Sequence, residues 1–382
     1  MNQNITRTYW PYIFSGFGAL LALGFLDNIR GPFYPDVIHT LGLTETQAAW
    51  FFATPSLVMV LGSIITPKML TLMTPLWALR IGLLSMGLGF MSFGFISDFY
   101  QMLLSGFVFG LGFGIVNVMQ NYMIQVGAQT HLRQRLFSGL HANYAGAAIL
   151  VSFAVSFLKH WGWSKVFLVM GALPIVIALF TFLSKESLDH MEVRKKKDRL
   201  PNSVFWQALL VSAGFAFYLT AELGLSTRLV HFLETDLGYS KEVANYHFLG
   251  LFVGMFLSRV IFTKVTLPVQ PITLIATGAI GTTVAVFVCL FYQPWATVAA
   301  GFFIGPIFPA FLEYINLKFP LFSDRVLAIS LSVSAIGVVI MHNVVGYLSE
   351  TMGIQKALMV SPFGAVIFVM ILGYHHKMFK GR

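Results

Sequence analysis

The sequence predicts an all-α membrane protein, with twelve transmembrane helices in two pseudosymmetric six-helix bundles around a central cavity. Three observations support this fold class: a composition poor in charge, a series of long apolar runs, and an internal repeat. The chain has 382 residues, of which 57% are hydrophobic and only 10% are charged. A soluble domain carries roughly 25% charged residues. Because the chain lacks the charge needed for a water-facing surface, we expect it to lie in a lipid bilayer.

The apolar runs define the predicted helices in order along the chain. Each run is about 20 residues long, which is enough to cross a hydrocarbon core of about 30 Å. The first run continues through Asp27 and Arg30 with no small-residue cleavage site, so we interpret it as a helix and not as a signal peptide. The twelve runs lie near residues 10–33, 46–66, 76–97, 101–127, 137–158, 164–184, 203–230, 241–263, 270–291, 294–317, 326–348 and 356–374.

One polar stretch divides the runs into two sets of six. It reads SKESLDHMEVRKKKDRLPNS, is rich in charge, and contains Pro201 near its end. Such a composition is typical of a solvated linker. The sequence therefore predicts an N-terminal bundle at 1–184, a cytoplasmic linker at 185–202 and a C-terminal bundle at 203–382.

The two halves are also related in sequence. GFVFGLGFGIVNVMQN at 106–121 matches GFFIGPIFPAFLEYIN at 301–316 in the spacing of its glycines and its final asparagine. Nearly the same spacing separates two acids inside apolar runs, Asp27 and Glu222. We interpret this as a duplicated membrane unit. Because a charged side chain in lipid is costly, both acids are candidate functional residues.

The basic residues give a topology and exclude a nucleic-acid partner. The net charge is +9, and most of the 24 lysines and arginines fall in the segments that lie inside if the N-terminus is inside. This bias predicts a multi-pass protein of the plasma (bacterial inner) membrane with both termini in the cytoplasm. The basic excess is therefore explained by topology. Cys289 is the only cysteine, so no intrachain disulfide is expected.

Polar side chains are concentrated in certain runs. The third, sixth, ninth and twelfth runs have no ionisable or amide group in their middles, so we expect these helices to face lipid. The other helices would line a polar cavity, an arrangement typical of alternating-access transporters. The polar residues in those runs are Asp27, Asn28, Arg30, Asn117, Gln120, Asn121, Gln125, His141, Asn143, Glu222, Asn245, His247, Glu313, Asn316, His342 and Asn343.

Four segments carry a likeness to a known family: GFLDNIRGPFYPDVIHTLGLT at 24–44, RLFSGLHANYAGAAILVSF at 135–153, FYLTAELGLSTRLVHFLETDLGYS at 217–240 and GLFVGMFLSR at 250–259. With these segments the chain resembles the fucose–proton symporter-like sugar transporters of the major facilitator superfamily. The resemblance to the superfamily covers essentially the whole chain. It implies a monomer that takes up a small polar solute, most readily a monosaccharide, by symport with protons and with no cofactor.

The chain departs from the family pattern at several points. In that family, a carboxylate in the first helix and another in the N-terminal half are associated with proton coupling and substrate handling, and the seventh helix often carries a glutamate. Asp27 and Glu222 match the first and the last of these. A second N-terminal carboxylate of the family has no counterpart here. The loop after the second run lacks the superfamily signature G-x-x-x-D-R-x-G-R-R. The segment NYAGAAILVS has no proline, unlike the pattern of proton–drug antiporters, which favours symport over drug export.

The acids suggest roles in proton coupling and gating. Asp27 and Arg30 are three residues apart, so a helix would place them on one face as an ion pair. That pair would be either a proton site or a static brace. Glu222 has no basic residue within a helical turn, which suits a group that gains and loses protons. It could instead be a protonated glutamate bonded to a neighbouring helix. Glu313 lies near Lys318 and fits either a cytoplasmic gate or a substrate contact.

Neutral polar residues at mid-membrane are candidates for binding the solute. Amides can bind sugar hydroxyl groups, but they equally form hydrogen bonds between helices. The two histidines could relay protons or could be satisfied structural groups. The predicted substrate-binding residues are Gln120, Asn121, Asn143, Asn316, His141 and His247.

The sequence has no signature of an enzyme. It contains no G-x-x-x-x-G-K-S/T phosphate loop, no H-E-x-x-H motif and no Cys/His cluster, so neither ATP hydrolysis nor a resident metal is expected. Three alternatives to proton-coupled sugar uptake stay open at this point. They are a proton-coupled exporter of amphipathic compounds, sodium-coupled sugar uptake, and a membrane enzyme or receptor.

Overall fold

The structure, a computed structural model, describes residues 8–184, 200–264 and 269–379. Over these residues it contains twelve helices that are long and apolar enough to cross a membrane. The prediction of an all-α protein with twelve membrane spans is confirmed. Most of the predicted linker at 185–202 lies outside the described residues, and the predicted domain limits stay a prediction.

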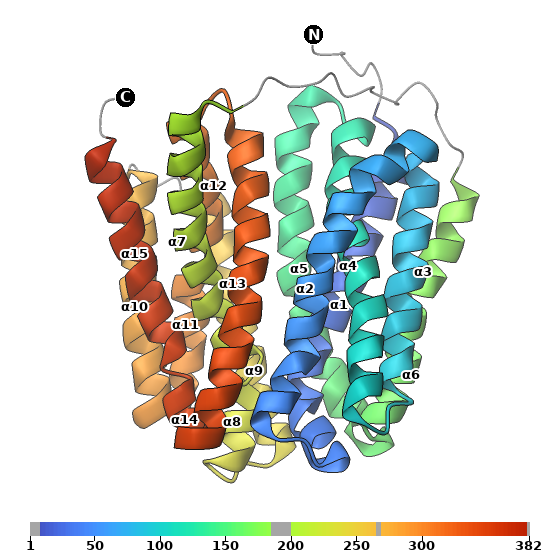
Figure 1. Cartoon of the computed structure of the whole chain (residues 1–382), viewed down its shortest axis with the longest axis vertical. Coiled ribbons are helices and arrows are strands. Elements are labelled where there is room, and N and C mark those ends of the chain that lie inside the picture. The colour runs from blue at the N-terminus through green and yellow to red at the C-terminus, as the bar shows by residue number, and fades with distance from the viewer. Residues whose placement is uncertain (1–7, 185–199, 265–268, 380–382) are drawn as a thin grey trace. The chain divides into compact units, whose positions relative to one another are not determined.

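The helices of the first half follow the six predicted runs closely (Figure 1). They are α1 (Trp10–Leu41), α2 (Glu45–Leu72), α3 (Pro75–Phe93), α4 (Phe99–Gly127), α5 (Thr130–Leu158) and α6 (Trp163–Phe180), with short 3₁₀ helices η1 (Lys159–Trp161) and η2 (Thr181–Leu183).

The second half contains more helices than the six apolar runs predicted for it. They are α7 (Asn202–Ser226), α8 (Leu229–Thr235), α9 (Lys241–Lys264), α10 (Pro271–Phe291), η4 (Pro294–Ala296), α11 (Thr297–Ile304), α12 (Ile307–Lys318), α13 (Ser323–Met352), α14 (Ile354–Ala357) and α15 (Val360–Met378). The tenth run is divided at Pro306, which has no N–H for the helix ladder. The seventh run also ends early, because the chain turns at Thr227 and Arg228 before α8 begins.

By their internal contacts the residues form two compact units. Unit 1 comprises Met1–Arg30 and Thr54–Lys196, and unit 2 comprises Gly31–Ala53 and Lys197–Arg382. The division therefore falls inside α1 and inside α2. Each crossing point lies next to a proline, Pro32 in α1 and Pro55 in α2. A proline inside a helix removes one backbone hydrogen bond, so both helices are weakened where they pass between units.

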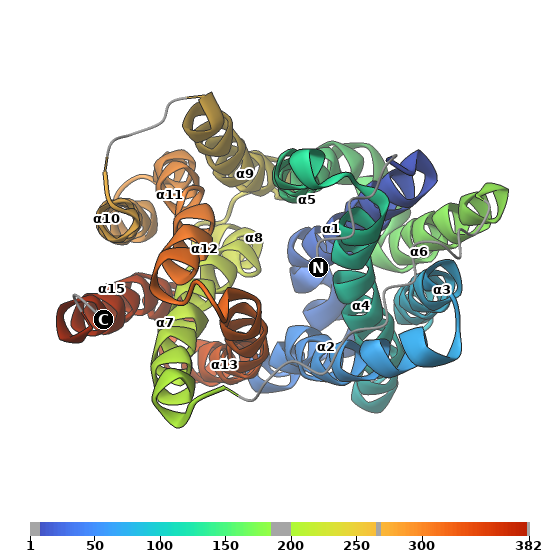
Figure 2. The same cartoon turned by 90° about the horizontal axis from the view of Figure 1, so that it is seen from above.

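In unit 1, α4 is the helix that approaches its neighbours most closely. A Cβ added at Gly110 would lie 2.6 Å from the carbonyl oxygen of Pro55, and one at Gly114 would lie 2.1 Å from that of Met59. Only glycine permits this approach of α4 to α2. The outer pair α3 and α6 pack against each other (Figure 2).

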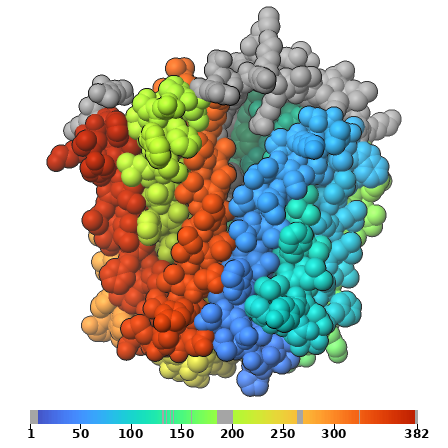
Figure 3. All heavy atoms as spheres, viewed as in Figure 1, coloured from blue at the N-terminus to red at the C-terminus, as the bar shows by residue number. Residues whose placement is uncertain are grey.

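Unit 2 repeats this design. Gly301, the counterpart of Gly106, lies so close to α9 that an added Cβ would be 1.8 Å from the carbonyl oxygen of Leu251. Helix α7 packs against α13 and α15, and these three helices form the visible face of unit 2 in the space-filling view (Figure 3). Helices α10 and α15 pack together, as α3 and α6 do in unit 1. The duplication inferred from sequence therefore extends to the helix contacts.

Candidate functional site

Asp27, in α1 of unit 1, has two partners that bind its two carboxylate oxygens. Arg30, one helical turn further on, donates a hydrogen bond to Asp27 Oδ1. Tyr144, from α5, donates its hydroxyl to Asp27 Oδ2 at 2.6 Å. The side chains of Asp27 and Arg30 are 21% and 5% exposed, respectively. The predicted ion pair is thus formed. Its role in proton coupling stays a prediction.

The helix spacing and a neighbouring ring position this group. Residues three apart share one helix face, which places the Arg30 guanidinium beside Asp27. The guanidinium also lies 5.2 Å from the centre of the Phe109 ring of α4, a favourable cation–π distance. Tyr144 brings α5 against α1, because Gly24 leaves room for it: an added Cβ there would be 3.0 Å from the Tyr144 ring. The Asp27–Arg30 pair therefore links α1, α4 and α5 of unit 1.

The amide side chains of unit 1 lie on α4 and α5. Gln120 is buried and donates to Asn117 Oδ1 at 3.2 Å, while its own Oε1 has no partner among the described residues. Asn121 donates to the Asn117 carbonyl at 2.9 Å. Asn143 donates to the Phe17 carbonyl of α1 at 2.8 Å. The side chain of His141 lies outside the described residues. Gln120 is the member of this set that keeps a buried acceptor for another group.

Glu222 of unit 2 lies near the C-terminal end of α7. Tyr218, one turn earlier on the same helix, donates its hydroxyl to Glu222 Oε2. The Tyr218 ring is buried and stacked on Phe215, which in turn is stacked on Phe311 of α12 at 4.4 Å. Tyr218 is thereby held in place, and it orients a half-buried acid. Its role in proton coupling also stays a prediction.

The other predicted residues of unit 2 have different surroundings. His247 is buried, and its ring lies 4.2 Å from Trp295 and 5.7 Å from Tyr239, so it packs as an aromatic group. Glu313 and Asn316 are exposed on α12. Lys318, which the sequence placed within reach of Glu313, donates to the Phe379 carbonyl at 3.0 Å. The binding and gating roles of these residues stay predictions.

A second polar group in unit 2 was not predicted from sequence. We call it the α8 cluster; its members are Tyr34, Glu45, Phe52, Arg228 and His231. His231 Nε2 lies 2.6 Å from Glu45 Oε1, and Tyr34 donates to Glu45 Oε2 at 3.3 Å. The Arg228 guanidinium lies 3.9 Å from the centre of the Tyr34 ring and 5.2 Å from that of Phe52. The cluster joins the ends of α1 and α2 to α8.

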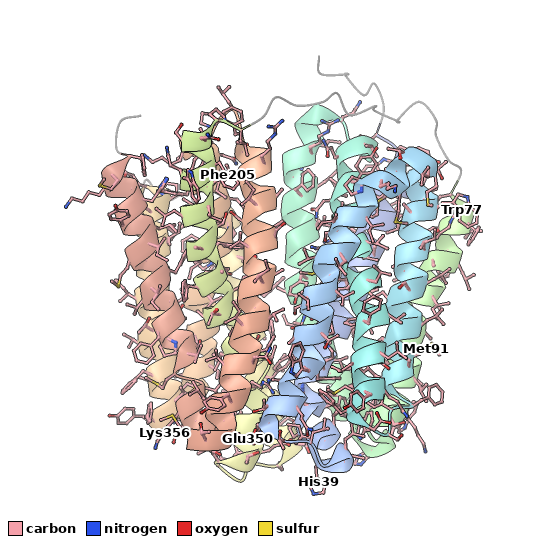
Figure 4. All side chains as sticks on the ribbon, viewed as in Figure 1. His39, Trp77, Met91, Phe205, Glu350 and Lys356 are labelled. Atoms are coloured by element: carbon pink, nitrogen blue, oxygen red, sulfur yellow. The ribbon has the colours of Figure 1, made fainter. Side chains whose placement is uncertain are left out.

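Further polar contacts surround the α8 cluster. Lys241 pairs with Asp36, and Thr46 donates to Glu350 Oε2 at 2.6 Å. Glu350 and His39 lie at the end of unit 2 opposite Phe205 (Figure 4). Burial raises the pKa of Glu234 in α8 to about 7, with the charge of Asp36 adding to the rise and that of Lys241 opposing it. This end of unit 2 is therefore tied by several ionic contacts.

The sequence could not have revealed the α8 cluster. Glu45 and His231 are separated by 186 positions, so no helical spacing connects them. Arg228 follows the seventh span directly, between α7 and α8. Only the structure shows that its side chain is 1% exposed. A buried arginine of this kind has no local sequence signal.

The fold, with one buried or half-buried acid in each half, defines a polytopic membrane protein built from two duplicated halves. Residues 16–321 match the Major Facilitator Superfamily. The chain belongs to this superfamily of secondary transporters, which are not enzymes, and it is a multi-pass membrane protein.

Two curated proteins are similar in sequence. The protein TsgA homolog of Buchnera aphidicola is 21% identical over 282 residues, which cover 70% of this chain and 71% of that protein. Bypass of stop codon protein 6 of Saccharomyces cerevisiae is 22% identical over 341 residues, covering 75% of this chain and 66% of the yeast protein.

Solved transporter structures share the fold. A bacterial homolog of the human lysosomal transporter Spinster, inward-facing and occupied, has a TM-score of 0.74 at 15% identity, covering 97% of this chain and 98% of that one. A D-xylose-proton symporter has 0.73 at 12% identity, with coverages of 95% and 97%. FucP in the outward conformation has 0.64 at 17% identity, with coverages of 96% and 99%. At such identities the likeness concerns the fold alone.

Proposed function

We propose that this chain is a proton-coupled symporter that takes up a small polar solute, such as a monosaccharide, across the plasma (bacterial inner) membrane. The resemblance to fucose–proton symporter-like transporters supports this proposal. The observation that carries it is the Asp27 site of unit 1. There, a carboxylate is held by a cation on its own helix and by a hydroxyl group from another helix.

Protonation of Asp27 would change both of these contacts. A bound proton neutralises the carboxylate, so the attraction that holds Arg30 is lost and Tyr144 faces a weaker acceptor. The link between α1 and α5 would loosen as a result. Release of the proton on the other side of the membrane would restore the pair. Proton binding and helix rearrangement are thereby coupled at one residue.

The amides of the same unit would bind the solute. Gln120 offers a buried acceptor, and Asn121 and Asn143 lie on α4 and α5. Donors and acceptors of this kind match the hydroxyl groups of a polyol. Binding would be sensitive to the packing of α1, because Asn143 donates to the Phe17 carbonyl of that helix. Glu222, which receives the Tyr218 hydroxyl, is the second proposed proton-coupling residue.

Flux through proteoliposomes tests the proposal. The purified protein would be reconstituted, and a panel of labelled hexoses, pentoses and polyols would be offered with the external medium acidic, with a sodium gradient, or with neither. We expect at least one solute to accumulate in response to the pH gradient, and a protonophore to abolish the accumulation. Accumulation that requires sodium, or net expulsion of amphipathic compounds, would replace proton symport with one of those mechanisms.

Variants connect the flux to the site. Asp27→Asn and Glu222→Gln should each reduce accumulation driven by the pH gradient. Asn28→Ala is a matched control, because Asn28 is adjacent in sequence but donates only within its own helix, to the Gly24 carbonyl at 2.7 Å. The control should keep its coupling. Intact gradient-driven uptake in Asp27→Asn would remove Asp27 from the mechanism.

A further inference from the structure

Three arginine side chains are buried in the described part of the chain, and they differ in how their charge is satisfied. Arg30 is paired with Asp27. Arg80 donates to the Thr181 hydroxyl and to the Thr181 carbonyl, each at 2.9 Å. Arg228, which is 1% exposed, has no hydrogen-bond partner for Nε, Nη1 or Nη2 among the described residues. Its guanidinium is thus the buried cation without an oxygen ligand.

Aromatic rings contact Arg228 but do not satisfy its donors. Tyr34 and Phe52 present ring faces at 3.9 Å and 5.2 Å. Arg80 is stacked in the same way, at 4.0 Å from Phe182, yet it also has its two oxygen contacts. A ring attracts the charge of a guanidinium, whereas the N–H groups need acceptors. Stacking on two rings therefore leaves the N–H groups of Arg228 without hydrogen-bond acceptors among the described residues.

Burial without an acceptor is unfavourable for this group. The free energy lost when a cation is removed from water normally exceeds the free energy gained from cation–π contacts. Burial accordingly lowers the pKa of Arg228 to about 9, but the side chain stays charged at neutral pH. A buried cation that is kept in the charged form is a ready partner for an anion. The geometry of a guanidinium suits an oxyanion that accepts two parallel hydrogen bonds.

The acidic residues of this region do not bind Arg228. Glu234 of α8 keeps a buried oxygen, Oε1, that has no hydrogen-bond partner among the described residues. Glu45 receives His231 on one oxygen and Tyr34 on the other. Asp36 is paired with Lys241. Within the described residues, the guanidinium of Arg228 therefore has no hydrogen bond to Glu45, Asp36 or Glu234. An anion from outside the described residues would supply the acceptor that this guanidinium lacks.

We propose that Arg228 binds a carboxylate group of the transported solute, so that the solute is an organic acid such as a sugar acid. This inference rests on the proposed transport function and narrows its solute class. One guanidinium balances the single charge of a carboxylate, whereas a phosphate dianion would leave excess negative charge beside Glu45. The flanking rings of Tyr34 and Phe52 would cover the apolar face of such a solute.

Binding can be measured without transport. The detergent-purified protein would be heated with increasing concentrations of D-glucuronate, D-galacturonate or glycerate, and in parallel with D-glucose, D-galactose or glycerol. Each acid differs from its neutral partner by one carboxylate. We expect at least one acid to raise the unfolding temperature at concentrations where its neutral partner does not. Arg228→Gln should weaken this effect about 10- to 100-fold, because a charge-assisted pair is lost.

Two further variants separate ligand binding from folding. Arg228→Gln removes a buried charge, so it should fold, and Arg228→Lys keeps the charge without the bidentate geometry and should bind with intermediate strength. Arg80→Gln is the control for a buried, stacked arginine, because its donors are satisfied within the chain. It should lower the unfolding temperature without changing the preference for acids. Equal stabilisation by acids in wild type and Arg228→Gln, or no preference for any acid, would overturn the inference.

Flux measurements distinguish this inference from the proposed function. If the pH gradient drives uptake of neutral solutes only, the symport proposal stands and the carboxylate site is wrong. If no solute responds to a pH gradient but an acid still stabilises the protein through Arg228, the carboxylate site stands and proton symport is wrong.

Discussion

Replacing Asp27 by asparagine should have two separable effects, one on stability and one on coupling. The variant keeps an oxygen and an NH₂ group at the site but loses the negative charge. Arg30, whose side chain is 5% exposed, then loses the negative charge of Asp27 beside it. Breaking a fully buried pair costs about 3–5 kcal/mol and breaking an exposed one at most about 1 kcal/mol. Since Asp27 is 21% exposed, we expect a loss of about 2–3 kcal/mol.

A double-mutant cycle isolates the pair. Asp27→Asn, Arg30→Gln and the double variant would be compared with wild type by thermal unfolding in one detergent. The double variant should be more stable than Asp27→Asn, because it removes the buried positive charge together with its carboxylate. Its proton-driven uptake should nevertheless stay lost, because no carboxylate is left to bind the proton. Recovery of proton-driven uptake in the double variant would show that the pair is only a structural brace.

Three further predictions concern packing, pH and the hydroxyl contact. Gly301→Ala should lower the free energy of unfolding by about 1–3 kcal/mol, because the added Cβ would meet a backbone oxygen at 1.8 Å. Gly373→Ala is the control and should leave stability unchanged, because its added Cβ would have nothing within 4 Å; thermal unfolding checks both variants. The folded-state pKa of Glu234 is raised to about 7 from 4.5, so the folded state binds the extra proton between these values and stability should fall as pH rises through that window. Glu234→Gln should flatten this part of the stability–pH curve, and an unchanged slope would contradict the assignment. Tyr144→Phe removes a donor 2.6 Å from the Asp27 carboxylate, so uptake driven by the pH gradient should fall; uptake equal to that of wild type would separate that contact from coupling.

Much of the fold could be predicted because its causes are local. A long apolar run is a membrane helix for reasons of length and hydrogen bonding, so the twelve spans followed from the chain directly. The glycines at 106 and 301 also revealed the duplicated helix contacts, since close backbone approach requires glycine. The Asp27–Arg30 pair was predictable because three residues along a helix return to one face. The divided tenth helix was missed, although Pro306 was a visible signal.

The α8 cluster could not be predicted because its causes are non-local. The contact between Glu45 and His231 depends on how α2 and α8 are folded together, which a single sequence does not state. The hydroxyl of Tyr144 binds Asp27 although the two residues are 117 positions apart, so no local spacing indicates this contact. Arg228 follows a membrane span, and nothing in the sequence around it indicates that its side chain is buried. Topology rules place a residue relative to the bilayer and say nothing about burial inside the protein.

The most direct test of the coupling account compares two modes of transport in the same proteoliposomes. Counterflow measures exchange of labelled for unlabelled solute without a gradient, whereas accumulation requires a proton to move with the solute. We predict that Asp27→Asn keeps counterflow and loses accumulation driven by the pH gradient. Accumulation equal to that of wild type in this variant would contradict the account.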